Sequence, residues 1–442
     1  MRGTGYVCTS CGARAPRWQG RCGACAEWNT LEVTASAPRT RPAADATTQP
    51  LRGVDPEGAA RRATGVDELD RVLGGGLVAG STTLLFGEPG VGKSTLALTA
   101  LLSVAARGEE VLLVAAEESA GQVAGRARRL GPVPEGVEVA TTTSAPAAAE
   151  LIARRAPTLC VVDSVSAMSD EGLASATGSV PQVRQAAERL CAVAKAAGTA
   201  LVLVGHVTKD GDLAGPRALE HLVDTVVRVE GDRHGSLRVV RALKHRFGAT
   251  GEVGLFEMGE AGLVEVADVA ALAGPRLSVP GVARTITNDG SRAFPVDVQV
   301  LVARAPGAPR RVAYQVSAAR LSLLIAVLEA RCGVDLGPHD VFAAAAGGLP
   351  ASEPAVDLAL ALALASAATG TALDPDLVAL GEVGLAGELR AVEGLERRVR
   401  EARRRGARVI LVPGGAVAGD AGAGAVRPCR SLAEALAAAG LA

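Results

Sequence analysis

The stretch GEPGVGKS, at residues 87–94, is the feature that most restricts how this chain can fold. It fits the spacing G-x-x-x-x-G-K-[ST], follows the apolar run STTLLF and precedes the helical run TLALTALLSVAA. Glycines at this spacing let successive backbone N–H groups curl around phosphate oxygens, between a strand and the first turn of a helix. The stretch therefore predicts an α/β domain that binds a phosphorylated ligand.

The side chains around this loop indicate a nucleotide that carries Mg²⁺. In such loops the Lys93 ammonium reaches the β- and γ-phosphates, and the Ser94 hydroxyl reaches the metal. The run LCVVDS places Asp163 at the end of an apolar strand, where a carboxylate holds the Mg²⁺ shell, although a plain turn residue is the alternative. The residues expected around the nucleotide are Gly87, Glu88, Pro89, Gly90, Val91, Gly92, Lys93, Ser94, Thr95 and Asp163.

Two further strand ends carry polar groups that suit this chemistry. Parallel sheets bind ligands at the carboxyl ends of their strands, and VLLVAAEES places Glu117 and Glu118 at such an end. We expect Glu117 to orient or deprotonate the attacking water, with Glu118 as the alternative base. In LVGHVTK, one of His206, Thr208 and Lys209 is expected to sense the γ-phosphate, unless these residues only cap a helix.

Apolar runs alternate with helical segments from Ala63 to about Met258, which predicts a parallel sheet. Two later runs, 226–230 and 236–243, are separated by GDRHG and predict a hairpin. The four runs expected to form parallel strands are 81–86, 110–116, 159–163 and 200–205.

Four of the eight cysteines form two C-x-x-C pairs near the start of the chain. A tight turn in each pair lets both thiolates converge on one ion, and a set of four sulfurs favours a closed, structural zinc site. A redox pair or an iron site is the alternative. Arg14, Arg17 and Arg21 either contact nucleic acid or lie in a solvated loop. The expected metal ligands are Cys8, Cys11, Cys22 and Cys25.

Length and charge narrow the remaining possibilities. A chain of 442 residues corresponds to about three domains. The formal net charge of −1 gives no global attraction for nucleic acid, so any polyanion site must be a local patch. The apolar run 358–368 is about half of the ~20 residues that a bilayer span needs, which predicts a buried helix and no membrane association. The start MRGTGYVC lacks an apolar leader, and the other cysteines are scattered, which favours the reducing cytoplasm.

The order of the motifs is that of a known family. ATGVDELDRVLGGGLVAGS precedes the loop, and AAEES, VVDSV, GHVTKDG and KHRFG follow it. Together with the cysteine module and an extra C-terminal domain, they resemble the RecA-type ATPases, and more closely the bacterial RadA (Sms) family. The resemblance covers nearly the whole chain except the linker. It implies a RecA-like P-loop core using ATP, Mg²⁺ and Zn²⁺, and a DNA-stimulated ATPase of recombinational repair that promotes branch migration or strand exchange.

The same resemblance implies partners. They are single-stranded DNA, branched DNA intermediates and a recombinase, with the chain itself assembled as a homo-hexameric ring. The segment 170–180, DEGLASATGSV, resembles the mobile pore loop that contacts DNA in RecA relatives. Because this loop has no aromatic residue, we expect phosphate contacts rather than base stacking there.

The stretch KHRFG, at residues 244–248, resembles the family pentapeptide KNRFG, with His245 in place of the Asn. In RecA-like rings the nucleotide lies between subunits. The resemblance therefore implies that Lys244 and Arg246 stabilise the charge on a neighbour's γ-phosphoryl group, in the manner of an arginine finger. The alternatives are a contact with the DNA backbone and a surface salt bridge.

The C-terminal region resembles the proteolytic domain of Lon-type proteases, through PAVDLALALALASA and the segment 381–407. Lon chemistry needs a serine activated by a lysine. The alignment puts Ala355 at the serine position and Glu396 at the lysine position, and neither can do that chemistry. Ser352 and Ser366 remain as hydroxyls, but no lysine follows Lys244, so the resemblance implies an inactive scaffold that assembles the ring.

The segment 393–408 carries seven arginines on a helical pattern. It predicts either a solvated helix or an arginine stripe that faces DNA. Pairs four residues apart stabilise such a helix by a few tenths of a kcal/mol each, roughly. The expected pairs are Glu393/Arg397, Glu396/Arg400 and Glu401/Arg405.

These patterns together predict four segments: a zinc module (1–30), a Pro- and Ala-rich linker (31–62), a RecA-like ATPase domain (63–265) and a Lon-like domain (275–442). Two other functions stay open at this point. One is an ATP-dependent protease, which Ala355 and Glu396 disfavour. The other is a DNA-binding scaffold that uses ATP only to lock a ring.

Overall fold

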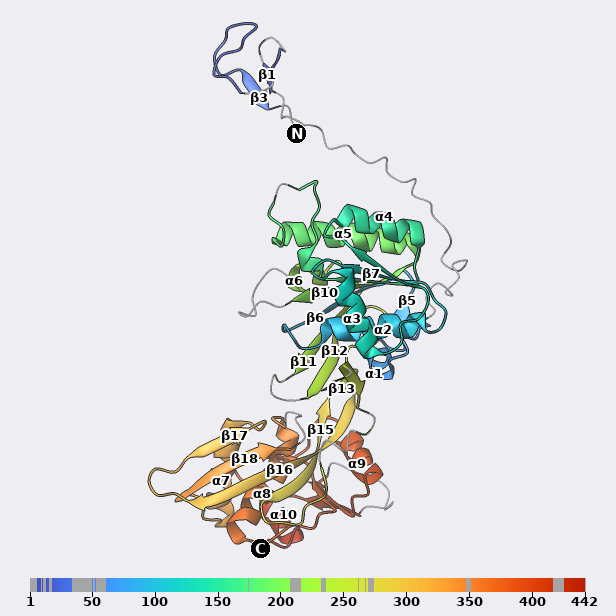
Figure 1. The fold of residues 1–442 in the computed structure, drawn as a ribbon. Helices are drawn as coiled ribbons and strands as arrows, with labels where there is room; N and C mark the ends of the chain where they lie inside the picture. The colour runs from blue at the N-terminus through green and yellow to red at the C-terminus, as the bar shows by residue number, and fades with distance from the viewer. Residues whose placement is uncertain are drawn as a thin grey trace. The chain divides into compact units, whose positions relative to one another are not determined.

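A computed structural model shows two compact units, Met1–Pro56 and Glu57–Ala442 (Figure 1). The first contains a small ribbon, and the second contains two sheets with their helices. The residues that the structure describes are 6–8, 10, 13–15, 18–33, 50, 52, 61–173, 175–206, 216–231, 236–260, 262–266, 268, 274–346, 351–415 and 425–441.

The first unit holds a three-stranded antiparallel sheet in the order β2-β1-β3. Among its described residues the small core consists of Cys8, Cys22 and Leu31, so two of these three buried residues are predicted metal ligands. So small an apolar core cannot hold a fold alone, and such modules depend on their metal. The strands are β1 (Tyr6–Cys8), β2 (Arg14–Ala15) and β3 (Leu31–Val33).

The second unit begins with a nine-stranded sheet in the order β14-β13-β12-β11-β6-β10-β9-β7-β8. Strands β11, β6, β10, β9, β7 and β8 run parallel, and β12 to β14 are antiparallel. The bounds are β6 (Thr82–Gly87), β7 (Val111–Ala115), β8 (Val137–Thr141), β9 (Leu159–Asp163), β10 (Ala200–His206), β11 (Thr225–Gly231), β12 (Leu237–His245), β13 (Val253–Gly259) and β14 (Gly262–Glu265).

The parallel sheet and the hairpin agree with the runs predicted from the sequence, but three strands of the sheet, β8, β13 and β14, were missed. Strand β8 reads VEVAT and lies at the edge of the sheet, where its residues stay half-buried or exposed. An edge strand with alternating polar residues lacks the continuous apolar run that marks the central strands.

Helices cover both faces of this sheet (Figure 1). Alternate strand residues supply the two cores: Leu85 and Leu113 face α1, α2 and α3, whereas Leu84 and Leu112 face α4, α5 and α6. The bounds are α1 (Asp67–Val72), α2 (Lys93–Ala105), α3 (Ala120–Leu130), α4 (Ala145–Arg155), α5 (Val180–Ala197) and α6 (Pro216–Glu220), with a 3₁₀ turn η3 (Val165–Ala167) and a short pair β4 (Arg61–Arg62) and β5 (Leu77–Val78).

The C-terminal part is a second α/β layer structure. Its seven-stranded sheet has the order β17-β18-β16-β15-β19-β22-β23, with α7, α8 and α10 packed on one face and α9 on the other. The bounds are β15 (Val282–Asp289), β16 (Arg292–Arg304), β17 (Arg311–Tyr314), α7 (Ala318–Cys332), β18 (His339–Ala345), η5 (Pro354–Val356), α8 (Asp357–Thr369), β19 (Leu377–Ala379), β20 (Glu382–Val383), β21 (Leu389–Arg390), α9 (Leu395–Arg404), β22 (Val409–Pro413), β23 (Ala425–Cys429) and α10 (Leu432–Ala438).

The expected fold class is confirmed: a RecA-like core, a four-cysteine ribbon before it and a Lon-like α/β domain after it. The limits predicted for each domain stay predictions. Helix α8 is the predicted buried helix, and its residues from Asp357 to Ser366 are buried. Within the described ranges, no helix combines the length and apolar character that a bilayer crossing requires.

The two sheets are joined through β13. Its residues Val253 and Leu255 belong to the same apolar core as Phe294 in β16. The Glu68 carboxylate of α1 accepts hydrogen bonds from the Leu255 N–H (2.9 Å) and from the Arg292 guanidinium. An apolar core reinforced by a charged pair joins the nine-stranded sheet and the C-terminal domain within one compact unit.

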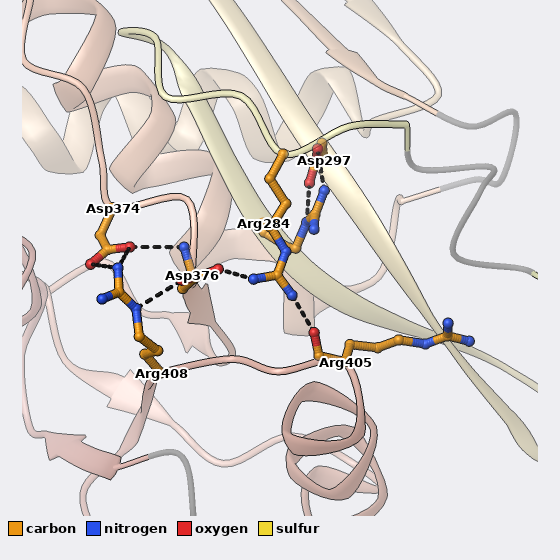
Figure 2. A network of polar contacts seen from close by, with 7 residues as sticks. Arg284, Asp297, Asp374, Asp376, Arg405 and Arg408 are labelled. Carbon is orange, nitrogen blue, oxygen red and sulfur yellow. Dashed lines mark hydrogen bonds and ion pairs between the residues drawn. The ribbon is translucent and has the colours of Figure 1, made fainter.

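Polar networks also fix the loops of the C-terminal domain (Figure 2). Arg408 binds Asp376 at 2.8 Å and Asp374 at 3.2 Å, and so ties the segment after α9 to the segment before β19. Beside it, Arg284 and Asp297 form a two-pronged pair across β15 and β16, with distances of 2.6 and 2.8 Å. Bidentate pairs of this kind fix geometry as well as charge.

The positions that align with the Lon dyad lie near a buried ion pair. Ala355 lies in η5 and is 1% exposed, and Glu396 lies on the exposed face of α9. Their neighbours Glu353 and Arg398 bond to each other at 2.6 and 2.7 Å, and Arg398 is only 2% exposed. An arginine stays charged in proteins and cannot serve as a base. The pair therefore serves as a structural clamp between η5 and α9.

The burial of Arg398 corrects the view of 393–408 as a uniformly solvated helix or DNA-facing stripe. Of the three predicted pairs, Glu401 and Arg405 meet at 2.9 Å, whereas Arg397 donates instead to the Gly290 carbonyl (3.1 Å). One face of α9 packs on the sheet through Val399 and Arg398, so only the remaining arginines face outward.

We predict that Glu353→Gln destabilises the C-terminal domain. The amide leaves the Arg398 charge buried without a counter-charge, and losing one partner of a buried pair costs about 3 kcal/mol. Urea denaturation of the full chain measures this loss. The matched control is Glu396→Gln, an exposed change on α9 that should leave the unfolding free energy unaltered. Equal stability of the two variants would contradict the prediction.

The same clamp gives a dependence on pH. Burial alone would raise the pKa of Glu353, but hydrogen bonds from Arg398, Thr287 and the Asn288 N–H lower it below its ordinary value. A lowered folded-state pKa contributes stability above the unfolded pKa, and that contribution disappears as the pH falls through the lowered value. Acid should therefore weaken the wild-type domain more than the Glu353→Gln variant.

Candidate functional site

The predicted phosphate loop joins β6 to α2, as its sequence context requires. Gly92 adopts φ +108°, and a Cβ there would lie 2.8 Å from Met258 Cε and 3.0 Å from Leu263 Cδ1. At Gly87 a Cβ would lie 2.2 Å from the Val229 carbonyl oxygen. Only glycine therefore fits at either end of the loop, because the β13–β14 hairpin and β11 press against it.

The predicted side chains meet at one edge of the sheet. In the strand register, His206 lies beside Gly87, and Asp163 lies beside both Val204 and Ala115. Glu117 follows Ala115 by two residues at the end of β7. The carboxyl ends of β6, β7, β9 and β10 thus bring the loop, the two carboxylates and the histidine together, as expected for parallel strands.

Lys93 lies at the centre of this edge. It is 3% exposed, and its ammonium donates to the carbonyls of Gly87 and Glu88, both at 2.9 Å. Burial lowers the pKa of Lys93, and the charges of Asp163 and Glu117 partly oppose that shift. The ammonium is therefore held inside the loop, beside the two carboxylates.

Glu117 and Glu118 have different surroundings. The Ser164 hydroxyl, which is fully buried, donates to Glu117, and His206 Nε2 lies 3.6 Å from the same carboxylate. Glu118 instead pairs with Arg126 of α3 at 3.0 Å. Arg126 also lies 3.4 Å from the Asp163 carboxylate. Glu117 therefore faces the phosphate loop with a polar group on each side, whereas the charge of Glu118 is offset by Arg126.

Sequence reasoning missed Ser164, Arg126 and Arg238 at this site. The S-x-x-Q signal of a capping box was available: Ser119 and Gln122 cap α3, which fixes the helix start and so the place of Arg126 two turns later. Arg238 of β12 donates to the Val91 carbonyl at 3.2 Å, although the two residues are 147 positions apart in the sequence. No local sequence pattern predicts a contact at that separation. Thr208 and Lys209 lie outside the described residues.

Lys244 and Arg246 do not join this site within the chain. Strand β11 runs parallel to β6, with Thr225 beside Thr83, and the antiparallel β12 returns to place His245 beside Thr225. The stretch KHRFG therefore lies by the start of β6, whereas the loop follows its end. At about 3.3 Å per residue, the four steps from Thr83 to Gly87 span roughly 13 Å.

The two cations of this stretch, Lys244 and Arg246, differ in their partners and in their exposure. The Lys244 ammonium donates to the carbonyls of Glu220 (2.5 Å) and Val223 (2.8 Å), at the end of α6. Arg246 pairs with Asp224 at 2.9 Å and is 56% exposed at its side chain. Arg246 is thus the more accessible cation, and Lys244 stabilises the end of a helix.

His245, which stands where the family pentapeptide has Asn, makes two hydrogen bonds. Its Nε2 lies 3.1 Å from the Leu73 carbonyl, and its Nδ1 lies 3.0 Å from the Thr225 hydroxyl. Since the carbonyl can only accept, Nε2 donates and Nδ1 accepts, which are the two functions that a side-chain amide also offers. Burial and the nearby Arg61 charge lower the pKa of His245, which favours this neutral form.

The first residues of the segment 170–180 are held by an ion pair and by hydrogen bonds to α5. Asp170 is 2% exposed and pairs with Arg189 at 2.7 Å. The Gln182 amide of α5 accepts from the Asp170 N–H (2.8 Å) and donates to the carbonyls of Leu173 (2.9 Å) and Ser175 (3.0 Å). These bonds hold the first half of the segment against α5, and Ala174 lies outside the described residues.

Three predicted metal ligands converge in the ribbon. The sulfurs of Cys8, Cys22 and Cys25 lie within 4.8 Å of one another, and those of Cys8 and Cys25 are 3.6 Å apart. Tetrahedral zinc with bonds of about 2.3 Å needs sulfurs about 3.8 Å apart, so the cluster fits such an ion. Backbone N–H groups of Cys25 and Ala24 lower the pKa of the Cys22 thiol. The fourth predicted ligand, Cys11, lies outside the described residues.

We predict that the ribbon holds about one zinc ion per chain, and that replacing both Cys22 and Cys25 by serine reduces it to near zero. Two of four thiolates cannot hold the ion at comparable affinity. Elemental analysis of purified protein measures the content. Cys332→Ser, outside the ribbon on α7, is the control. Full zinc retention in the double variant would mean that the metal lies elsewhere.

Three family comparisons match separate parts of the chain. A family described as an AAA domain matches residues 55–212, a rubredoxin metal-binding domain matches residues 6–32, and subunit ChlI of Mg-chelatase matches residues 326–416. A solved KaiC-like protein from Pyrococcus horikoshii aligns with 47% of this chain and 99% of its own, at 21% identity and a TM-score of 0.40.

Curated relatives match almost the full length. The DNA repair protein RadA of Mycolicibacterium smegmatis is 44% identical, over 94% of this chain and 93% of its own length. The protein of the same name from Pseudomonas aeruginosa is 44% identical, over 95% and 94%. That of Escherichia coli is 41% identical, over 92% of each chain.

Proposed function

This chain belongs to the RadA family of DNA repair proteins, and from that premise we propose that it is a DNA-dependent ATPase of recombinational repair. ATP hydrolysis drives branch migration or strand exchange on recombination intermediates. The observation that carries the proposal is the convergence of Lys93, Asp163 and Glu117 on the phosphate loop. An ATPase needs these three groups together at one strand edge.

The roles of the residues follow from their places. The loop N–H groups and Lys93 hold the β- and γ-phosphates, so the ammonium exchanges its two carbonyl partners for phosphate oxygens. Ser94 and Asp163 would hold Mg²⁺, which when bound supplies neutralisation of charge on the phosphates. Glu117 orients and deprotonates the attacking water, with Ser164 fixing its carboxylate. His206, next to Glu117, is placed to respond to the state of the γ-phosphate.

Completion of the site by a neighbouring subunit follows from the position of KHRFG. Arg246 lies by the opposite end of β6 from its own loop, so its exposed guanidinium cannot serve its own nucleotide. In a ring of like chains it reaches the neighbour's γ-phosphate. Lys244 instead fixes the end of α6, through its hydrogen bonds to the carbonyls of Glu220 and Val223. Contact of either cation with the DNA backbone is the alternative.

The remaining parts serve assembly and DNA binding. We propose a cytoplasmic homo-hexamer that binds single-stranded and branched DNA through the segment 170–180 and works with a recombinase. The ribbon carries structural zinc, and the C-terminal domain assembles the ring. A protease function is disfavoured, because Ala355 and Glu396 occupy the positions where Lon chemistry would need a serine and a lysine.

The first test is phosphate release with and without single-stranded DNA. We expect DNA to stimulate the wild-type rate, and Glu117→Gln to lower it about 100-fold or more while ATP binding persists, because a general base supplies about that factor. Glu118→Gln is the matched control and should keep most of the rate. A wild-type rate that DNA does not change would favour the ATP-locked scaffold.

The second test mixes subunits. Lys93→Ala removes ATP binding, and Arg246→Ala removes the cation, so each homogeneous ring should be inactive. A mixture should recover ATPase activity, because some interfaces pair an intact loop with an intact Arg246. Mixing Lys93→Ala with Asp163→Asn, two defects of the same half-site, should recover nothing. Equal activity in the two mixtures would remove the role of Arg246 across the interface.

A further inference from the structure

Both tryptophans of this chain lie in the zinc ribbon. They are the only two among 442 residues of which 2% are aromatic, and both are exposed, Trp18 by 56% and Trp28 by 70%. Elsewhere in the described residues most large apolar side chains are buried in four cores, although Tyr314 is 59% exposed and Phe247 36%. Two exposed indoles within one small module point to an interaction site.

The two indoles lie beside the same glycine. A Cβ on Gly20 would be 3.6 Å from Cζ3 of Trp28 and 3.9 Å from Cη2 of Trp18. Both rings therefore border one spot, and the absence of a side chain at residue 20 keeps the space between them open. A larger residue there would contact both rings.

A short hairpin holds this spot rigidly. Arg21 and Trp28 pair across it as an antiparallel bridge, the Asn29 N–H donates to the Gly20 carbonyl (2.9 Å), and the Cys22 N–H donates to the Glu27 carbonyl (2.8 Å). The metal-ligand residues Cys22 and Cys25 lie inside the same hairpin. The rings are thus supported by the backbone that the cysteine cluster closes.

A cation accompanies the rings. The Arg21 guanidinium carbon lies 5.7 Å from the centre of a Trp28 ring, and its Nε donates to the Ala26 carbonyl (2.6 Å). The carbonyl bond fixes the guanidinium beside the indole face, and the side chain stays exposed. An exposed guanidinium beside an indole can bind a phosphate with its remaining N–H groups.

We propose that Trp18, Trp28 and Arg21 form a stacking platform for the unpaired bases of a single-stranded nucleic acid. Indole faces stack on any base, and an adjacent arginine neutralises the phosphate, which is the composition of sites that bind single strands without sequence preference. The DNA segment proposed in the core, 170–180, has no aromatic residue. The ribbon thus supplies the stacking that the core lacks.

The proposal that the ligand is DNA rests on the proposed function. The platform itself is tested without ATP, so the two can fail separately. Because the chain has no other tryptophan, its tryptophan fluorescence, excited selectively over that of the two tyrosines, comes from the platform residues alone. The full-length protein is titrated without nucleotide against oligo(dT) and against an abasic strand of equal length, which has the same phosphates but no bases. We expect oligo(dT) to quench the fluorescence strongly and the abasic strand to leave it nearly unchanged.

Variants provide the second readout. In a ribbon that keeps its zinc content, Trp28→Ala should weaken binding of a short labelled oligo(dT) about 5- to 150-fold, the range for one lost stacking contact. Trp28→Phe should restore part of the affinity, and Gln19→Ala, an exposed neighbour, should have no effect. If Trp28 had only a structural role, the affinity for oligo(dT) would not follow the size of the aromatic ring in the order Trp, Phe, Ala.

Three outcomes would overturn the platform. One is equal quenching by the abasic strand, which indicates electrostatic contact alone. Another is an unquenched signal while labelled DNA still binds and stimulates the ATPase, which leaves the proposed function intact. The third is a fluorescence change on adding a recombinase but not DNA, which makes the surface a protein contact. A wild-type ATPase rate that DNA does not raise would instead contradict the proposed function.

Discussion

A buried ammonium is the constraint on which the nucleotide edge of this structure depends. Lys93 is 3% exposed, and a charge at that depth is costly unless its donors are satisfied. The curled loop satisfies them with the carbonyls of Gly87 and Glu88. Those bonds require the tight loop, the tight loop requires glycine at both ends, and the hairpin β13–β14 and strand β11 close over those glycines. The ammonium already makes these bonds charge-assisted, and a phosphate oxygen in place of a carbonyl would add a charge on the acceptor side.

The features that local chemistry dictates were predictable from the sequence. The loop, its flanking strand and helix, and Asp163 at the end of LCVVDS each follow from short-range patterns, and so does the buried helix α8. The edge strand β8 was missed, because its alternating polar residues face solvent. Patterns of burial reveal strands that are covered on both faces better than strands at an edge.

Features set by long-range packing could not be predicted. Arg398 belongs to a segment that reads as a surface helix, yet it is buried because Glu353, 45 residues earlier, supplies its counter-charge. Arg126 and Ser164 border the predicted carboxylates through turns whose direction depends on the whole sheet. From sequence alone, a charged residue is predicted to lie at the surface. That prediction fails where the fold brings a residue of opposite charge beside it.

The sheet also connects the nucleotide loop to the C-terminal domain. Strand β12 carries Arg238, which bonds to the Val91 carbonyl of the loop at 3.2 Å, and Arg241, which bonds to Asp289 of β15 at 2.8 Å. Next to it, Val253 and Leu255 of β13 fill the C-terminal core. A displacement of the loop carbonyl therefore acts on a strand whose other contacts lie in the second sheet. Close packing leaves little free space beside this strand in which such a shift could be absorbed.

A second connection runs along β6 to the stretch KHRFG. The Asp224 carboxylate accepts from the N–H and the hydroxyl of Thr82, both at 3.0 Å, and its other oxygen pairs with Arg246 at 2.9 Å. Thr82 is the first residue of the strand that ends in the phosphate loop. Under the proposed function, a neighbour's phosphate that attracts Arg246 draws its guanidinium away from Asp224, and the carboxylate then keeps only its bonds to the start of β6. The proposal therefore makes Asp224 the residue through which occupancy of one site would alter the charge balance at the start of the strand that leads to the next loop.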